Sequence, residues 1–105
     1  MMHCRIARED LKGELPRLYS QQTEIDPIVY KRLVAPGSRW ACYLAEASEK
    51  DDDLRLFGFF FGEIQTWNSI SLSALEAAAQ EAHLDIQIDR EFRPMRFSCI
   101  RRDVR

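Results

Sequence analysis

The sequence predicts an α+β fold, with a single antiparallel sheet of about four strands and two main helices in one domain over residues 1–105. Three observations lead to this prediction. The chain has 105 residues, 46% of them hydrophobic and 30% charged, which suits one soluble domain with its own core. Segments rich in β-branched and aromatic residues are separated by polar turns. One alanine-rich segment follows a helix start motif.

The first half of the chain predicts a short helix followed by strands. Residues 9–15 form the helical segment, with Leu11 and Leu15 among its apolar positions, and Pro16 is expected to end it. Three strands are expected after it, over residues 28–34, 40–45 and 54–64. The stretch EASEKDDD, residues 46–53, predicts an exposed acidic loop between the last two strands.

The second half predicts a capped helix and one more strand. Ser73 and Glu76 form a capping box, and the alanines after them favour a helix that ends near His83. In LDIQI, residues 84–88, apolar and polar residues alternate, which indicates a strand at the side of the sheet with one face in water. Pro94 limits any continuation, and the arginine-rich end of the chain predicts a frayed tail.

The run LRLFGFFFGEI, residues 54–64, would place aromatic residues on both faces of the third strand. Three alternate residues point to one face and have the volume of a core face: Phe57, Phe59 and Phe61. Phe60 points to the other face and lies between Gly58 and Gly62. Glycine weakens a strand, so each of these glycines implies a structural reason, such as a bulge or a close contact.

The Phe60 face is the first candidate interaction surface. Two short helices cover about one face of such a sheet, which would leave this second face, with Tyr43 or Trp40, partly exposed. An exposed apolar patch usually marks an interaction site. The alternative is that the N-terminal helix and the C-terminal tail cover it.

Charge is distributed unevenly along the chain. The net charge of −2 argues against generic nucleic-acid binding, because proteins that hold phosphates usually carry a basic excess. Acidic residues gather in the predicted loop, and arginines gather after position 89. The acidic candidates for docking on a basic partner surface are Glu49, Asp51, Asp52 and Asp53.

The sequence predicts no catalytic residues, no metal site and no cofactor. The two histidines and three cysteines do not have metal-ligand spacing, and the four glycines form no phosphate-binding loop. The apolar run at residues 56–62 is too short to span a membrane, and no signal segment is evident, so we expect a cytoplasmic protein with free thiols. A small enzyme of unknown reaction is an alternative, with Glu46, Glu63, Asp89 or Cys42 as candidates.

Several short motifs follow one another in a characteristic order. They are LPRLYSQQ (15–22), DPIVY (26–30), Trp40 with Tyr43 and Glu46, LFG (56–58) with Gly62, SLSALE (71–76) and DREFRP (89–94). This order resembles the family catalogued as domain of unknown function 2958, over most of the chain. The resemblance implies a cytoplasmic accessory protein of plasmids, integrative elements or phages, without established catalytic residues. In place of the Gly-aromatic pair expected before SLS, the chain has Trp67, Asn68, Ser69 and Ile70.

The leading hypothesis is a non-enzymatic protein–protein interaction module of a mobile genetic element. Together with the resemblance, it predicts an inhibitor of a bacterial defence complex, similar to an anti-CRISPR protein, with a host defence effector as partner. An alternative is an accessory protein of plasmid DNA processing that contacts single-stranded nucleic acid through Arg93, Arg96, Arg101 and Arg102. A homodimer, joined through Phe60 faces or edge strands, competes with both.

Overall fold

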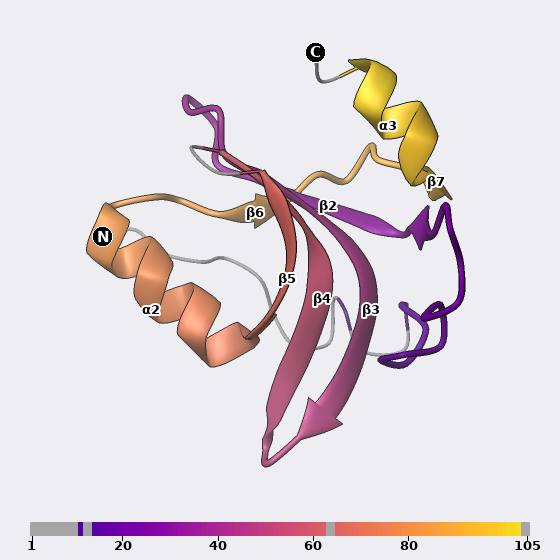
Figure 1. Ribbon diagram of the computed structural model, residues 1–105. Helices are drawn as coiled ribbons and strands as arrows, with labels where there is room; N and C mark the ends of the chain where they lie inside the picture. The colour runs from indigo at the N-terminus through magenta and orange to yellow at the C-terminus, as the bar shows by residue number, and fades with distance from the viewer. Residues whose placement is uncertain (1–10, 12–13, 63–64, 104–105) are drawn as a thin grey trace.

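Figure 1 shows a computed structural model of the protein, which describes residues 11, 14–62 and 65–103. A five-stranded antiparallel sheet has the order β5-β4-β3-β2-β6, and a two-stranded sheet joins β1 to β7. The elements are β1 (Ile28–Val29), β2 (Lys31–Val34), β3 (Ala41–Lys50), β4 (Asp53–Phe61), β5 (Thr66–Ser71), α2 (Leu72–Ala82), β6 (Gln87–Ile88), β7 (Met95–Arg96) and α3 (Phe97–Asp103). Helix α2 lies against one face of the large sheet, and α3 lies on the other side (Figure 1).

The α+β class is confirmed, but the prediction of one sheet of about four strands is wrong. The predicted strand over residues 28–34 is interrupted at Tyr30, whose N–H donates to the Leu44 carbonyl at 2.8 Å. The piece before the interruption, β1, pairs with β7 in the C-terminal segment. That segment is therefore not a frayed tail in its described part, because it forms β7 and α3. The predicted last strand is shortened to β6, which does lie at an edge of the sheet.

The predicted acidic loop over residues 46–53 is also wrong, because β3 and β4 continue almost to its centre. Only Asp51 and Asp52 form the turn, with φ angles of 51° and 61°. Positive φ at both central residues is typical of the two-residue turn that suits the twist of a hairpin. Aspartate tolerates this conformation better than most residues do. The acidic residues thus lie at the end of a hairpin, and Glu46 is buried inside it.

The main helix is confirmed, but its capping residue is Ser71 and not Ser73. The Ser71 hydroxyl accepts a hydrogen bond from the Ala74 N–H at 3.2 Å. Ser73 instead donates from its hydroxyl to the Asp53 carboxylate in the hairpin. The helix ends at His83 in the left-handed conformation, as the sequence indicated. The predicted N-terminal helix lies largely outside the described residues, although Leu11 is buried in the core.

Both faces of the large sheet carry a cluster of buried residues. Leu56 and its neighbours on the α2 face form the main core, and Leu56 is fully buried. Phe60 and Trp40 are partly buried and pack against that core. Tyr43 is buried on the opposite face. Phe57, Phe59 and Phe61 lie on that opposite face and are also partly buried, and Phe59 and Phe61 pack against its cluster.

A β-bulge decides which side chains of β3 enter the core. The pairing of β3 with β4 shifts between Leu44 and Glu46, which leaves Ala45 as an extra residue. Before the bulge, Leu44 belongs to the core on the α2 face, and after it Ala47 does. Glu46 is therefore turned to the opposite face, although its position is even-numbered like that of Leu44.

Gly58 lies opposite Leu44 at the bulge and has no room for a side chain. A Cβ atom there would contact the Tyr43 carbonyl oxygen and would lie 3.0 Å from the Leu44 Cα. We expect Gly58→Ala to lower the free energy of unfolding by about 1–3 kcal/mol, because backbone atoms of β3 would have to move. Urea unfolding measures this, with Gly62→Ala as the control, since its Cβ would meet the Trp40 ring at an ordinary 3.5 Å. Equal effects of both substitutions would contradict the close contact.

Candidate functional site

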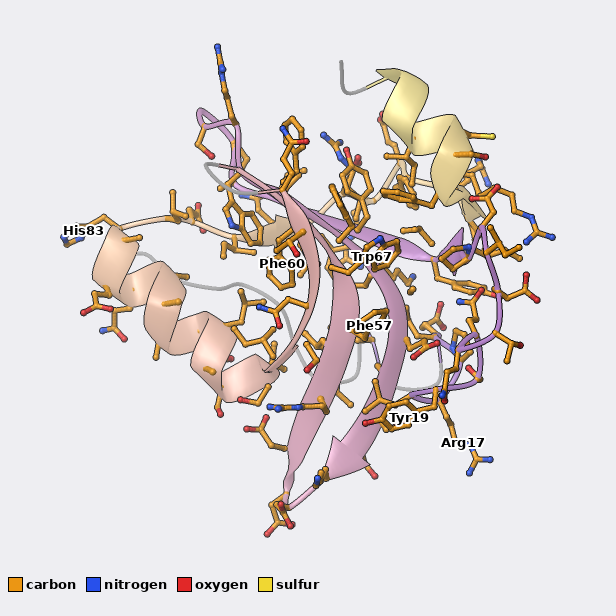
Figure 2. The ribbon with its side chains drawn as sticks, in the orientation of Figure 1. Arg17, Tyr19, Phe57, Phe60, Trp67 and His83 are labelled. Carbon is orange, nitrogen blue, oxygen red and sulfur yellow. The ribbon has the colours of Figure 1, made fainter. Side chains whose placement is uncertain are left out.

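A cleft of about 690 Å³ lies on the face of the sheet that carries Phe57. Its floor is formed by side chains of β3, β4 and β5, with Phe57 and Trp67 at the centre, and its wall is the loop over residues 18–27. Figure 2 shows Tyr19 on the same side of the sheet as these two rings. We call this feature the aromatic cleft. Its volume lies within the range typical of ligand pockets in proteins.

The floor of the aromatic cleft is a packed aromatic cluster. The Trp67 ring stacks on Phe57, with ring centroids 5.3 Å apart and an interplanar angle of 16°. Phe59 meets the same indole edge-on at 5.6 Å. Phe97, at the start of α3, packs on Trp67 at 4.8 Å. Offset and edge-on contacts of this kind stabilise aromatic clusters, so the floor is rigid while Phe57 and Trp67 keep part of their surface open.

The loop that forms the wall is held by the buried Glu46 carboxylate. Glu46 is 4% exposed, and its two oxygens accept hydrogen bonds from the Tyr19 N–H at 2.7 Å and the Gln21 N–H at 2.8 Å. The Ser48 hydroxyl accepts a further bond from the Leu18 N–H at 2.9 Å. A carboxylate used in this way satisfies backbone donors that the loop could not satisfy by itself.

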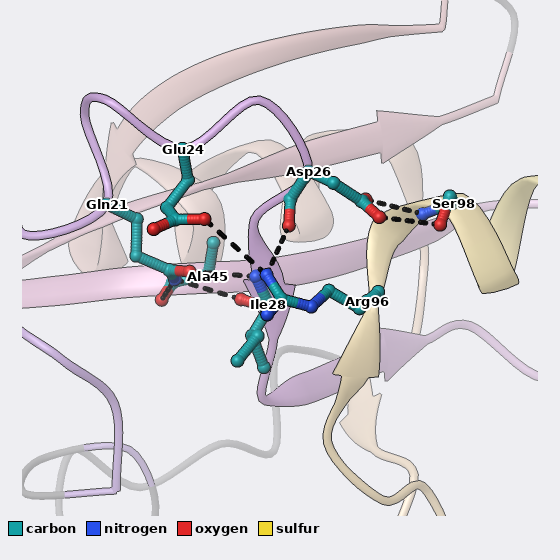
Figure 3. A network of polar contacts seen from close by, with 7 residues as sticks. All are labelled: Gln21, Glu24, Asp26, Ile28, Ala45, Arg96 and Ser98. Carbon is teal, nitrogen blue, oxygen red and sulfur yellow. Dashed lines mark hydrogen bonds and ion pairs between the residues drawn. The ribbon is translucent and has the colours of Figure 1, made fainter.

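The far end of the loop is fixed by a second polar network (Figure 3). The Gln21 amide donates to the carbonyls of Ile28 and Ala45, and its oxygen accepts from the Ile28 N–H. Asp26 accepts two bonds from Ser98 of α3, one from its N–H at 2.9 Å and one from its hydroxyl at 2.6 Å. The network therefore connects the loop, the sheet and α3.

Tyr19 and Ile25 stand at the rim of the aromatic cleft. They are 75% and 99% exposed, and within the described residues they are the large apolar side chains that lie exposed. Tyr19 has a φ angle of 70°, a left-handed conformation that costs a non-glycine residue about 1–2 kcal/mol. Its ring thus projects into solvent from a strained backbone. Strain that brings no visible packing in the monomer is typical of functional positions.

One end of the aromatic cleft carries two exposed cations beside the acidic end of the hairpin. Lys50 and Arg55 both line it and both are exposed. They also line a smaller hollow of about 280 Å³ together with Asp51 and Asp53. Asp53 accepts bonds from the Ser73 hydroxyl and N–H, so its carboxylate already has donors. At the loop side, Glu24 pairs with Arg96 at 3.5 Å. The exposed cations at this end can therefore attract an anionic group of a ligand.

The structure separates the residues that the sequence grouped as one docking surface. Trp40 and Phe60 meet edge-on at 6.3 Å and pack on the α2 side, while Tyr43 packs with Phe92 on the other. Glu49, Asp51 and Asp52 are exposed at the hairpin end, and Asp53 is partly buried there. None of these aromatic residues lines the aromatic cleft.

The arginines of the nucleic-acid alternative do not form one free patch in the described part. Arg93 is exposed, whereas Arg96 donates to the Asp26 carbonyl at 2.9 Å and pairs with Glu24. Arg101 and Arg102 belong to α3, and their side chains lie outside the described part.

The candidates for catalysis are used in packing where the structure describes them. Burial raises the pKa of the Cys42 thiol, which disfavours the nucleophilic thiolate. Both oxygens of Glu46 bind backbone N–H groups, and Asp89 pairs with Arg32 at 2.8 Å. Glu63 lies outside the described residues. Among those that are described, no group of three His, Cys, Asp or Glu residues could hold a metal ion.

No helix in the same part of the chain has the length and apolarity needed to cross a membrane.

The residues of the aromatic cleft were missed because their signals were weak. Tyr19 and Ile25 lie in YSQQTEID, a polar stretch that indicates a turn, and Trp67 lies in a segment expected to lead into the helix. Two large apolar residues in an otherwise polar loop could have been taken as a sign of a contact surface.

Comparisons with known proteins identify no relative. No family model matches the chain, and neither the curated proteins nor the solved structures contain a significant match. The resemblance to the family named above therefore stays a prediction.

Removal of the Glu46 charge tests how the loop is held. We expect Glu46→Gln to lower the free energy of unfolding by about 1–3 kcal/mol, because one backbone N–H would face an amide NH₂ group. Hydrogen exchange at the Tyr19 and Gln21 amides should accelerate more than exchange in β3. Glu81→Gln, exposed on α2, is the control and should stay within about 0.5 kcal/mol of the wild type. If Glu46→Gln changed neither the free energy of unfolding nor the hydrogen exchange of the loop, the role of this carboxylate would be contradicted.

Asp26 should make the attachment of the loop to α3 dependent on pH. The hydrogen bonds from the Ser98 hydroxyl and N–H, with the nearby Arg96 charge, lower the pKa of Asp26 below its ordinary value of 3.8. The ionised form is therefore favoured by folding, and its stabilising effect is present above 3.8 and lost as the pH falls through the lowered pKa. The wild type should exceed Asp26→Asn in stability near neutral pH, and the difference should shrink between about pH 5 and pH 2.

A double-mutant cycle provides the control for this pH effect. In a Ser98→Ala background the hydroxyl donor is absent, so the stability difference that Asp26→Asn causes should depend less on pH. An unchanged pH dependence in that background would show that the Ser98 hydroxyl is not its cause.

Proposed function

We propose that this protein is a non-enzymatic binding module that docks a segment of a protein partner in the aromatic cleft. The observation that carries the proposal is the position of Tyr19 and Ile25. Both exposed large apolar side chains of the described part stand at the rim of the same cleft, over a floor of stacked Phe57 and Trp67 rings. Interfaces gain most of their binding energy from such aromatic anchors around a central pocket.

A protein segment suits this site better than a small metabolite. Tyr19 and Ile25 project from the rim, where only a ligand that extends past the cleft would cover them. The end of the cleft at Lys50 and Arg55 favours a segment that carries a carboxylate beside its apolar side chain. The charged groups at the cleft are engaged in holding the loop or lie exposed, so the site favours binding over proton transfer.

An inhibitor of a bacterial defence complex would be one form of such a module. That more specific function rests on the resemblance and stays a prediction. The aromatic cleft replaces the Phe60 face as its docking surface, because Phe60 packs against the core. A contact with single-stranded nucleic acid receives less support, since Arg96 is engaged with Glu24 and Asp26.

Selection of peptides from a random library displayed on phage tests the proposal directly. We expect the protein to enrich peptides that contain a large apolar residue close to an acidic one. In titrations followed by fluorescence, the best peptide should bind Ile25→Asp about ten-fold more weakly or worse, as the loss of one anchor predicts. Gln80→Glu, a charge change on the far side of the sheet, should leave binding unchanged. A failure to enrich any peptide, or equal binding by Ile25→Asp, would overturn the proposal.

Tyr19 should show opposite effects on stability and on binding. Glycine adopts a positive φ without strain, so Tyr19→Gly should leave the free energy of unfolding unchanged or raise it by up to about 1 kcal/mol. The same variant should bind the selected peptide more weakly, because the ring is lost from the rim. Urea unfolding and peptide titration of one preparation provide both values. A clear loss of stability would mean that the ring is needed for folding.

A further inference from the structure

The edge strand β5 lacks the features that usually protect a sheet edge. Its sequence, TWNSIS, contains no charged residue and no proline. It pairs with β4 in unbroken register from Arg55↔Ser71 to Phe60↔Thr66, and no described strand pairs with its other side. The opposite edge, β6, has two residues and lies between Asp85 and Asp89. Short length and charge discourage strand addition there, whereas β5 remains open to it.

Two hydrogen bonds identify the outer backbone groups of β5. The Asn68 side-chain oxygen accepts from the Ser69 N–H at 2.8 Å, and the Thr66 hydroxyl donates to the Trp67 carbonyl at 3.2 Å. Backbone groups of successive residues point alternately to the two sides of a strand. Trp67 and Ser69 therefore direct their N–H and C=O groups away from β4, and Ser71 directs its N–H there, whereas its carbonyl belongs to the N-cap of α2. The bonds from Asn68 and Thr66 are local, and an incoming strand can replace them.

The same residues of β5 belong to the aromatic cleft. Trp67 and Ser69 line it, and cross-strand partners on one face of a sheet are neighbours. A residue added opposite Ser69 would lie on the same face as Phe57, with the small Ser69 side chain between them, and a residue opposite Ser71 would have the same relation to Arg55. Since Ser69 and Ser71 have small side chains, they leave the ring and the guanidinium accessible from this edge.

We propose that the partner segment is an extended peptide that adds antiparallel to β5 as a further strand of the sheet. This inference rests on the proposed function, and it adds the conformation and pattern of the ligand. All pairings of the large sheet are antiparallel, and the antiparallel arrangement is the slightly more stable one. In that direction the ligand carries an acidic residue opposite Ser71, followed two positions later by a large apolar residue opposite Ser69. Arg55 and Lys50 attract the acid, and Phe57 packs against the apolar side chain.

Hydrogen exchange with the selected peptide tests the inference without any substitution. Binding should slow exchange at the outer amides of Ser69 and Ser71 by about ten-fold or more, while Asn68 and Ile70, which point to β4, change little. This alternation distinguishes a bound strand from general covering of the cleft. Uniform slowing, or slowing confined to the loop over residues 18–27, would overturn strand addition.

A matched pair of variants provides an independent test. Ser69→Pro removes the outer N–H and tolerates the β4 pairing, because proline is accepted where the N–H of an edge strand faces solvent. It should bind the peptide at least about ten-fold more weakly, while Ser69→Ala, which keeps the N–H, should bind as the wild type does. Arg55→Glu should remove the preference for an acidic residue in a new selection. Circular dichroism and thermal unfolding confirm that each variant is folded.

The outcomes separate this inference from the proposed function. One outcome is that the selection enriches peptides that bind Ile25→Asp weakly but bind Ser69→Pro as they bind the wild type. In that case the cleft binds peptides and strand addition is wrong. If no peptide is enriched, both are overturned. If sedimentation instead shows a dimer, and Ser69→Pro abolishes that dimer, β5 pairs with a second copy of the chain. The inference of a bound peptide is then overturned.

Discussion

The buried Glu46 carboxylate is the interaction on which the aromatic cleft depends. It accepts hydrogen bonds from the Tyr19 and Gln21 N–H groups and so holds the loop over residues 18–27 against the sheet. The β-bulge after Leu44 makes this possible, because without the extra residue Glu46 would point into the leucine core on the α2 face. The bulge in turn needs Gly58, whose missing side chain admits the β3 backbone. One glycine, one bulge and one carboxylate thus position the wall of the site.

Much of the fold could be predicted from the sequence because it follows from local patterns. Strand β4, predicted over residues 54–64 and observed over Asp53–Phe61, the helix that ends at His83 and the edge position of residues 84–88 all follow from periodicity or capping residues; residues 63–64 lie outside the described part. The second sheet could not be predicted, because the pairing of β1 with β7 joins segments more than 60 residues apart. The acidic stretch was interpreted as a loop because composition does not show where a hairpin turns. Here the turn consists of only two aspartates.

Which helix covers which face of the sheet could not be predicted, for a related physical reason. Strand alternation correctly separated Phe57, Phe59 and Phe61 from Leu56 and Phe60, but volume does not decide which face a helix covers. The narrow stripe of α2, with Leu72, Leu75 and Ala79, packs against the leucine side together with Leu11 and Leu15. The short α3 covers only part of the phenylalanine side through Phe97 and Ile100. Phe57, Phe59 and Phe61 consequently stay partly exposed beneath the smaller helix.

The strained rim and the open edge have a common physical basis. Tyr19 has a left-handed backbone and a largely exposed ring, and two outer backbone groups of β5, the Trp67 carbonyl and the Ser69 N–H, bond to side chains of β5 itself. A ligand that covers the Tyr19 ring or pairs with β5 would offset the stability that these features cost. The two features lie at the same cleft, so a single extended segment can satisfy both at once. Backbone pairing would then supply affinity that does not depend on ligand sequence, while Phe57 and the Lys50–Arg55 end select the side chains.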